Sequence, residues 1–518
     1  MEMKDKYGDN RLKLFYGDFL KKLNSSENPL ENIISKSCMD FYYRFYESIP
    51  KSMVSYYKEL NKVFAKYLDI GKPGIGKIPD SPDVSLANGH DIFNYVARYG
   101  VGNFHSQAIM KLDGRLDFDK LSKAVRLSVD AEPVLGCRFV EGNPPYWKRL
   151  ENIDEVPFCS FEEVSDGDEA VQRFLESPLD MDRDPKIKVK LMRSKSYDIL
   201  GIKLNHACCD GAGHKEYIQL LSGIYSNIDH QDFIFTPRPS KRGRTDQDRL
   251  FNALGITDPN ALWIPGADIA LPTWAFPWKQ GTSSTTRIVV CKLPPDRLGW
   301  MKSYAKSRGA TINDLILTAY YRAMLRMGQP VYGAPMGITV TVDLRRYLPD
   351  KKTEAIRNFS GSVNTWLSMV EKEAFGDTLS RVVYMMNEIK KGYPGLQSAI
   401  GLERLEKINF KETIAYYQAI SRVGKSVPKC ATLYGNRCVP SLSNLGILSD
   451  SLIKFGNTTV TDAFIIPPVV RAPGLLLEAG TYNGIITMSA GFFENTVLRA
   501  DVERLLNNIK DELQEGLR

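Results

Sequence analysis

Apolar residues recur along this chain at two spacings, which predict strands and helices in a mixed order. Short apolar or alternating runs predict strands, because successive strand side chains point to opposite faces of a sheet. The predicted strands are Ser106–Leu112, Val134–Val140, Ile187–Met192, Tyr197–Leu204, Thr286–Leu293, Pro335–Val342, Ser362–Met369, Ala463–Val470, Gly474–Thr481 and Ile485–Phe493.

Steps of three and four residues between apolar positions predict amphipathic helices between these strands. Two of them have clear starts, because Asp117 and Thr311 are side chains that cap helix N-termini, and Asp314 follows three residues after Thr311. The predicted helices cover Asp117–Val129, Lys215–Tyr225, Pro295–Ser307, a segment from Thr311, Asp377–Lys390, Ser398–Ile420 and a segment from Val497. Strands and helices do not alternate regularly, so we expect a mixed α/β (α+β) fold.

Glycine and proline mark the boundaries of the predicted domains. Gly71–Pro82 reads GKPGIGKIPDSP, and Thr236–Ser284 is rich in Pro, Gly and Trp. The predicted division is an N-terminal helical extension with a Gly/Pro linker at residues 1–84, a subdomain at 85–240, a crossover linker at 241–284 and a second subdomain at 285–518.

The extension itself carries an aromatic-rich helical pattern between Phe41 and Tyr67. The face of this predicted helix opposite the aromatic residues carries most of four lysines, Lys51, Lys58, Lys62 and Lys66. Such a helix suits either a membrane surface or packing on the main body, and packing is favoured over membrane contact.

Composition excludes several classes of protein. The chain has 518 residues, of which 43% are hydrophobic and 25% charged, with a net charge of +7 spread along the sequence. Interspersed charge does not indicate a nucleic-acid partner. Its eight cysteines form no C-x-x-C pair, which argues against zinc ribbons and redox pairs, and the N-terminus has no apolar run typical of a signal peptide. We therefore expect a soluble, reduced, cytoplasmic protein that works as a monomer.

The candidate chemistry lies between a predicted strand and a predicted helix, in the segment NHACCDG at residues 205–211. A neutral imidazole has a pKa near ~6.5 and can take a proton from a hydroxyl or an amine, so His206 is a candidate general base. Asp210 follows four residues later, and Gly211 leaves room for a sharp turn or a passing substrate.

Other reactions fit this segment less well. A serine hydrolase needs a G-x-S-x-G elbow, which the chain lacks. Cys208 or Cys209 as nucleophile would have to face His206 within one tight turn. A metal site would have to recruit His206, Cys208, Asp210 and His214 at a spacing that matches no common ligand set, so no metal is expected.

The segment resembles the H-x-x-x-D-G signature of the coenzyme A-dependent acyltransferase superfamily, which includes chloramphenicol acetyltransferase, wax ester synthases, alcohol O-acetyltransferases and condensation domains. Further segments resemble the same proteins in the same order. They are LDGRLDFDKLSKAVRLSVDAEPVLGCRF at 112–139, ATINDLILTAYYRAM at 310–324, VTVDLRRYLP at 340–349, GSVNT at 361–365 and SNLG at 443–446. The resemblance covers roughly residues 87–516 and leaves the N-terminal extension unexplained.

The chain also departs from these relatives. Condensation domains usually carry two histidines where this chain has Asn205 and His206, their late signatures are missing, and the D-F-G-W-G box of the plant acyltransferases is absent. The nearest likeness is to stand-alone alcohol O-acetyltransferases. The resemblance implies two chloramphenicol acetyltransferase-like subdomains, each a mixed sheet flanked by helices, with a channel between them.

The resemblance also implies roles for particular residues. His206 would deprotonate an acceptor hydroxyl that attacks an acyl-coenzyme A thioester, with no covalent intermediate. Asp210 would be structural, in an ion pair with Arg345, and Gly211 would keep the donor channel open. The predicted substrate-binding residues are Asn205, Asn364, Thr365, Ser443 and Asn444; for the last four, a structural role in a strand or turn is an equal alternative.

Acyl-coenzyme A is expected as a co-substrate, with no bound cofactor, and the acceptor is expected to be an alcohol or an amine. A carrier protein is the alternative source of the acyl group. The alternative functions are a condensation-type N-acyltransferase, a carrier-protein-dependent acyltransferase, and a non-catalytic binding protein that keeps the fold.

Overall fold

The computed structural model describes residues 78–230, 233–237, 245–263, 273–279, 283–328, 335–368, 370–415, 417–418 and 437–516. The predicted helix between Phe41 and Tyr67, and nearly all of the predicted extension, lie outside the described residues. So does part of the predicted crossover linker.

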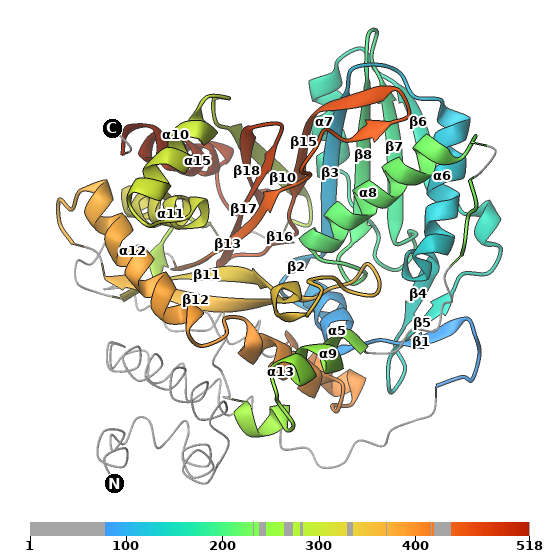
Figure 1. Cartoon of the computed structure of the whole chain (residues 1–518), viewed down its shortest axis with the longest axis horizontal. Coiled ribbons are helices and arrows are strands. Elements are labelled where there is room, and N and C mark those ends of the chain that lie inside the picture. Colours follow the sequence, from blue (N-terminus) through green and yellow to red (C-terminus); the bar gives the residue numbers. More distant parts are fainter. Residues whose placement is uncertain are drawn as a thin grey trace.

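Two large sheets, each flanked by helices, form the body of the chain (Figure 1). Helices α6 (Phe118–Ala131) and α8 (Gly211–Asn227) pack on one face of the first sheet, and α7 (Gly167–Glu176) packs on the other. The first sheet has six strands in the order β14 (Lys454–Phe455), β15 (Thr458–Ile466), β3 (His105–Leu112), β8 (Asp198–Asn205), β7 (Ile187–Arg193) and β6 (Cys159–Glu163).

The second sheet is covered on one face by helices α10 (Arg297–Ser307), α11 (Ile312–Met327), α12 (Phe375–Lys390) and α15 (Arg499–Glu515). Its strands lie in the order β10 (Thr286–Lys292), β18 (Ile485–Phe493), β17 (Gly474–Tyr482), β13 (Arg437–Ile447), β11 (Pro335–Asp343) and β12 (Ser360–Ser368), and β9 (Trp274–Ala275) pairs with β13. The predicted mixed α/β class is confirmed.

Smaller elements complete the fold around the two sheets. They are β1 (Val84–Leu86), β5 (Tyr146–Arg149) and β4 (Cys137–Val140) in a three-stranded sheet, the pair β2 (Gly102–Asn103) and β16 (Val469–Val470), and the helices α5 (Gly89–Val96), α9 (Thr245–Ala253) and α13 (Leu396–Leu405).

The first sheet takes two strands from the second predicted subdomain. β15 pairs antiparallel with β3, and β14 extends that edge. The predicted boundary between 85–240 and 285–518 therefore does not separate the two sheets. Local pattern identifies a strand but not its partner, because pairing between distant segments depends on the tertiary fold.

Helix starts agree with the capping residues read from the sequence. The side chain of Asp117 accepts a hydrogen bond from Lys120 N at 3.0 Å, and Thr311 and Asp314 form a reciprocal capping box at the start of α11. The single helix predicted at Ser398–Ile420 is wrong, because α13 ends at Leu405. The next helical turn starts at Asn409, whose side chain accepts from Lys411 N at 3.1 Å.

Candidate active site

His206 lies directly after β8, in the turn before α8, and other elements hold its backbone. Its N–H donates to the carbonyl of Phe104 at 2.8 Å. Asn358, from the connection between β11 and β12, donates its amide to the carbonyls of His206 at 2.8 Å and Ala207 at 2.9 Å. The main chain of the histidine turn is thus fixed from both halves of the molecule.

Burial favours the neutral form of the His206 imidazole. Desolvation lowers its pKa from the ordinary value of 6.5, and the nearby Asp210 carboxylate only partly opposes this shift. A neutral imidazole can accept a proton, so the electrostatic environment suits a general base.

The Asp210 carboxylate is buried, and both of its oxygens take part in structural contacts. It caps α8 by accepting from Gly213 N at 2.8 Å, and its other oxygen accepts from Phe359 N at 2.7 Å and from Arg345 Nη1 at 3.0 Å. Burial alone would raise its pKa, but Arg345 and these hydrogen bonds hold the pKa below its usual value. The ion pair predicted from the sequence is present.

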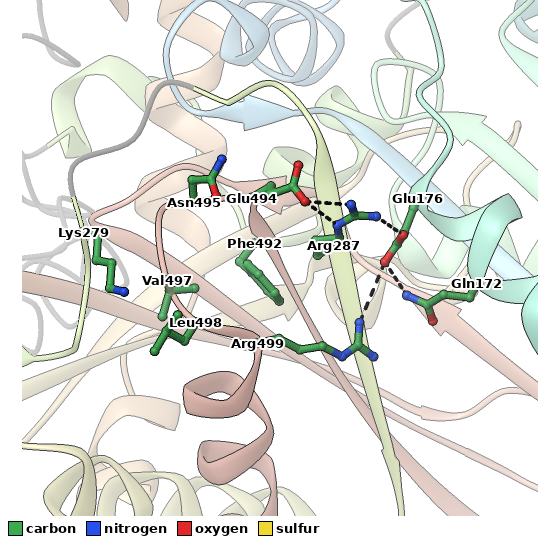
Figure 2. A pocket seen from close by; sticks show the side chains of 10 residues that line it. All are labelled: Gln172, Glu176, Lys279, Arg287, Phe492, Glu494, Asn495, Val497, Leu498 and Arg499. Atoms are coloured by element: carbon green, nitrogen blue, oxygen red, sulfur yellow. Dashed lines mark hydrogen bonds and ion pairs between the residues drawn. The ribbon is translucent and has the colours of Figure 1, made fainter.

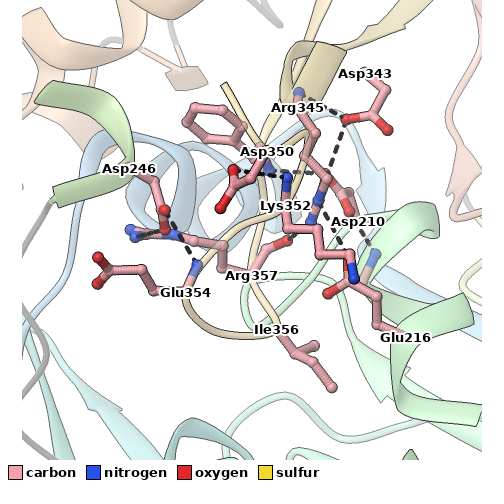
Figure 3. Close-up of polar contacts among 12 residues, drawn as sticks. Asp210, Glu216, Asp246, Asp343, Arg345, Asp350, Lys352, Glu354, Ile356 and Arg357 are labelled. Carbon is pink, nitrogen blue, oxygen red and sulfur yellow. Dashed lines mark hydrogen bonds and ion pairs between the residues drawn. The ribbon is translucent and has the colours of Figure 1, made fainter. Parts of the chain in front are cut away.

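Arg345 joins several acidic side chains at this point (Figure 3). Besides Asp210, it lies 3.3 Å from Glu216 on α8 and 3.3 Å from Asp343 at the end of β11. Its remaining guanidinium nitrogen donates to the carbonyl of Arg357 at 2.9 Å. The Arg345 and Asp210 side chains are only 4% and 5% exposed, so this pair is a buried connection between α8 and the β11–β12 segment, while Glu216 and Asp343 reach the surface.

Asn358 and its neighbours were not predicted from the sequence. Asn358 is fully buried, and Ile356 N donates to the Glu132 carboxylate at 3.2 Å, next to the first-sheet core. No local pattern marks Asn358, because its two acceptors lie about 150 residues earlier in the chain. Only the folded arrangement shows its contact with the histidine turn.

Gly211 lies where α8 meets β13. A Cβ atom at this position would come within 2.4 Å of a Leu445 methyl group. At Gly213, a Cβ would come within 2.8 Å of Cys209 Cβ and 3.1 Å of the Arg357 carbonyl. The glycines thus allow a close approach between the two halves, and the role of Gly211 in a donor channel stays a prediction.

Asn205 and the two cysteines shape the turn from inside. The Asn205 side chain accepts from Ala207 N at 3.0 Å and lies 3.1 Å from Met181 Sδ. Cys208 and Cys209 are buried in the first-sheet core, and burial raises the pKa of both thiols, as expected for apolar filling rather than nucleophiles. Substrate binding by Asn205 stays a prediction.

Thr365 has the structural strand role that the sequence left as an equal alternative to lining the channel. Thr365 is fully buried, and its hydroxyl lies 2.8 Å from the Tyr321 hydroxyl and donates to the Ile338 carbonyl at 2.7 Å. Neighbouring strand residues point to opposite faces, so Asn364 faces away from these groups. There it accepts from Thr339 Oγ1 at 2.7 Å, and its contact with substrate stays a prediction.

Ser443 and Asn444 have different surroundings at the end of β13. The Asn444 side chain accepts from Gly446 N at 3.0 Å and donates to Asn313 at 3.2 Å, which is the turn chemistry left open by the sequence. Ser443 pairs in register with Glu478 on β17, and its hydroxyl is a hydrogen-bond partner of that carboxyl. Their roles in substrate binding stay predictions.

The two faces of the second sheet differ in chemistry. Leu442, Leu477 and Met488 lie in the core beneath the helices. Strand alternation places a set of mostly small polar side chains on the other face. This polar face consists of Thr339, Ser362, Asn364, Ser441, Ser443, Glu478, Thr487 and Ser489.

The polar face looks toward the first half. Along the same face, a Cβ at Gly491 would come within 2.4 Å of Val469 on β16, and Leu445 packs against Gly211 at the start of α8. Four residues of this face are half-buried, and the other four are buried, namely Asn364, Glu478, Thr487 and Ser489. Polar groups withdrawn from bulk solvent need hydrogen-bonding partners, so this arrangement supports the channel predicted between the halves.

A second polar contact between the halves surrounds a cavity of about 440 Å³ (Figure 2). Arg287 on β10 forms ion pairs with Glu176 at the end of α7 and with Glu494 after β18, and Arg499 lies 3.9 Å from Glu176. None of the cavity's lining residues is a predicted site residue. Within the described parts of the chain, no group of three His, Cys, Asp or Glu side chains is placed to hold a metal ion.

Comparison with known proteins identifies the family. Residues 101–414, more than half of the chain, match the Condensation domain family model. The chain therefore belongs to the condensation domain family. Two uncharacterized proteins from Mycobacterium tuberculosis are 23% identical over 269 residues, which is 48% of this chain and 59% of each relative.

Solved structures share the fold at low identity. Polyketide synthase associated protein 5 from Mycobacterium tuberculosis aligns with a TM-score of 0.56 and 15% identity over 83% of this chain and 99% of its own. The first condensation domain of the CDA synthetase aligns with a TM-score of 0.57 and 14% identity, over 83% of this chain and 95% of its own. The TRI3 trichothecene 15-O-acetyltransferase from Fusarium sporotrichioides aligns with a TM-score of 0.58 and 13% identity, over 86% of this chain and 98% of its own. Across the described residues, no helix is long and apolar enough to span a bilayer.

Proposed function

We propose that this protein transfers an acyl group from a coenzyme A thioester to the hydroxyl group of an acceptor. One observation carries this proposal: the turn that holds His206 lies between the two halves, because its backbone is held by Phe104 from the first half and by Asn358 from the second. Membership of the condensation domain family supports acyl transfer as the reaction class, and the choice of donor and acceptor is the proposal's own.

The proposed reaction needs one base. The His206 imidazole takes the hydroxyl proton while the acceptor oxygen attacks the thioester carbonyl, so a C–O bond forms and the carbonyl oxygen becomes an oxyanion. When this intermediate collapses, the C–S bond breaks, and the protonated imidazole returns its proton to the leaving sulfur. Asp210 acts by holding the turn, because both of its oxygens are already bound, by Arg345 and by two backbone N–H groups.

The test is a donor and acceptor screen with the purified full chain. Acyl-coenzyme A thioesters of several chain lengths are mixed with alcohols and amines, and both free thiol and acylated product are measured. The proposal predicts ester formation that His206→Ala abolishes while the fold is retained. His230→Ala is the matched control, because this histidine is exposed. Wild-type rates in folded His206→Ala would overturn the assignment.

A second candidate is a condensation-type reaction with an acyl group carried on a carrier protein. The match of residues 101–414 to the condensation family favours it. The same histidine would then serve an amine or a hydroxyl. Turnover with an acylated carrier protein, and none with any acyl-coenzyme A, would decide for this candidate.

A further inference from the structure

Glu478 is a buried acid in the polar face, and the reaction proposed above does not use it. It lies in the middle of β17 and is 5% exposed. Its neighbours in register are Ser443 on β13 and Ser489 on β18, so three polar side chains form one row across three adjacent strands. A carboxyl group in a sheet interior needs a partner, because its burial is unfavourable without one.

The row leaves hydrogen-bonding capacity unused. Among the described residues, neither Glu478 Oε1 nor Ser489 Oγ has a hydrogen-bond partner, although both atoms are buried. Ser443 contacts the carboxyl, and Lys215 on α8 is the cation that acts on it electrostatically. Lys215 is itself held by the Leu445 carbonyl, to which it donates at 2.9 Å.

The surroundings favour a neutral carboxyl and a neutral ligand group. Desolvation raises the pKa of Glu478 to about 8, and Lys215 does not reverse this. A protonated carboxyl can donate one hydrogen bond and accept others, as can a serine hydroxyl. Such a set matches a ligand hydroxyl, which also both donates and accepts. A hydrocarbon would leave these groups without partners.

We propose that Glu478, with Ser443 and Ser489, forms a subsite that binds a second hydroxyl group on the acyl acceptor, so that the preferred acceptors are polyols rather than simple alcohols. The inference rests on the proposed function, since it names the acceptor class of the same site. Glu478 acts as a specificity residue, apart from the proton transfer at His206.

The experiment compares α,ω-diols with simple alcohols of the same chain length, using the full chain and the best acyl-coenzyme A donor. A fixed second subsite predicts that kcat/KM for diols peaks at one chain length, because only one separation places the second hydroxyl at Glu478. Glu478→Met and Ser489→Ala should lower kcat/KM at that peak by about tenfold each and leave simple alcohols unchanged. Glu478→Gln should retain most of the preference, and Glu371→Gln, an exposed glutamate, is the matched control.

Several results would overturn the subsite. One is a kcat/KM for diols that shows no peak with chain length, and another is an equal loss of kcat/KM for diols and simple alcohols in folded Glu478→Met. A third is a stronger preference for ω-amino alcohols than for diols, which would indicate an ionised carboxylate. If the wild-type protein releases no thiol with any donor, the proposed function fails by itself. Binding of the same diols and alcohols, measured by calorimetry without donor, then decides the subsite: equal binding of both series would refute it.

Discussion

Asp210 and Arg345 are 135 positions apart in the chain, and their side chains lie 3.0 Å apart in the interior. One caps α8 just after the histidine turn, and the other follows β11 in the second sheet. A buried pair of this kind stabilises little by itself, but removal of Asp210 leaves the Arg345 charge in the interior with only the more exposed Glu216 and Asp343 beside it.

Asp210→Ala should therefore lower the free energy of unfolding by about 3 to 5 kcal/mol, because the Arg345 charge loses its closest partner. Denaturant titration of the purified variant measures this change. The double variant Asp210→Ala with Arg345→Met should recover part of the loss, since it no longer buries a guanidinium that has lost its buried acidic partner. If the double variant loses as much unfolding free energy as the two single variants lose together, this explanation is contradicted.

Arg287 also forms an ion pair between the two halves, but unlike Arg345 it is partly exposed to solvent. Its side chain is 36% exposed, so its ion pairs with Glu176 and Glu494 are largely screened by solvent. Arg287→Ala should change the free energy of unfolding by less than about 1 kcal/mol. The same denaturant titration, run beside Asp210→Ala, checks the difference, and an equal loss in both variants would show that exposure does not set the cost.

Asn358 should act as a positioning residue. Asn358→Ala removes both hydrogen bonds to the His206 and Ala207 carbonyls, so we expect a fall in kcat of about tenfold with KM nearly unchanged. Steady-state kinetics separates the two constants. Circular dichroism and thermal melting serve as the control for folding, and a rise in KM alone would assign Asn358 to substrate binding instead.

The pH dependence of acyl transfer should reflect the lowered pKa of His206. The reaction needs the neutral imidazole, so activity should persist below pH 6.5 and fall only when the pH passes the lowered pKa. A pH profile of kcat/KM, taken within the range where the fold is stable, measures this acid limb. A midpoint above 6.5 would mean that the imidazole is charged more easily than its burial implies.

Stability should depend on pH through Glu478 in the opposite direction from an ordinary salt-bridged acid. Folding raises its pKa from 4.5 to about 8, so the native state holds the proton more tightly than the unfolded chain. Its stabilising contribution is full below 4.5 and lost as the pH rises to 8. Glu478→Gln lacks this titrating group and does not lose stability in this way. The unfolding free energy of the variant minus that of the wild type should therefore increase with pH, by up to about 5 kcal/mol. Equal pH slopes in both proteins would contradict the raised pKa.

Local chemistry allowed many elements to be predicted from the sequence alone. The strand predicted at Ile485–Phe493 matches β18, and Thr311 with Asp314 caps α11, because alternation and capping depend on neighbours a few residues away. The predicted ion pair of Asp210 with Arg345 is also present, although it came from a family resemblance rather than from local pattern.

The amino-acid sequence by itself determined the histidine turn, its acid and glycine, and the mixed α/β class, because short-range spacing and residue type fix these features. Only the tertiary structure decided that β15 joins the first sheet, that Thr365 lies in the core and that Asn358 holds the histidine turn. It also placed Glu478 between Ser443 and Ser489. These relationships join segments far apart in the chain, so strand pairing and packing determine them rather than local propensity.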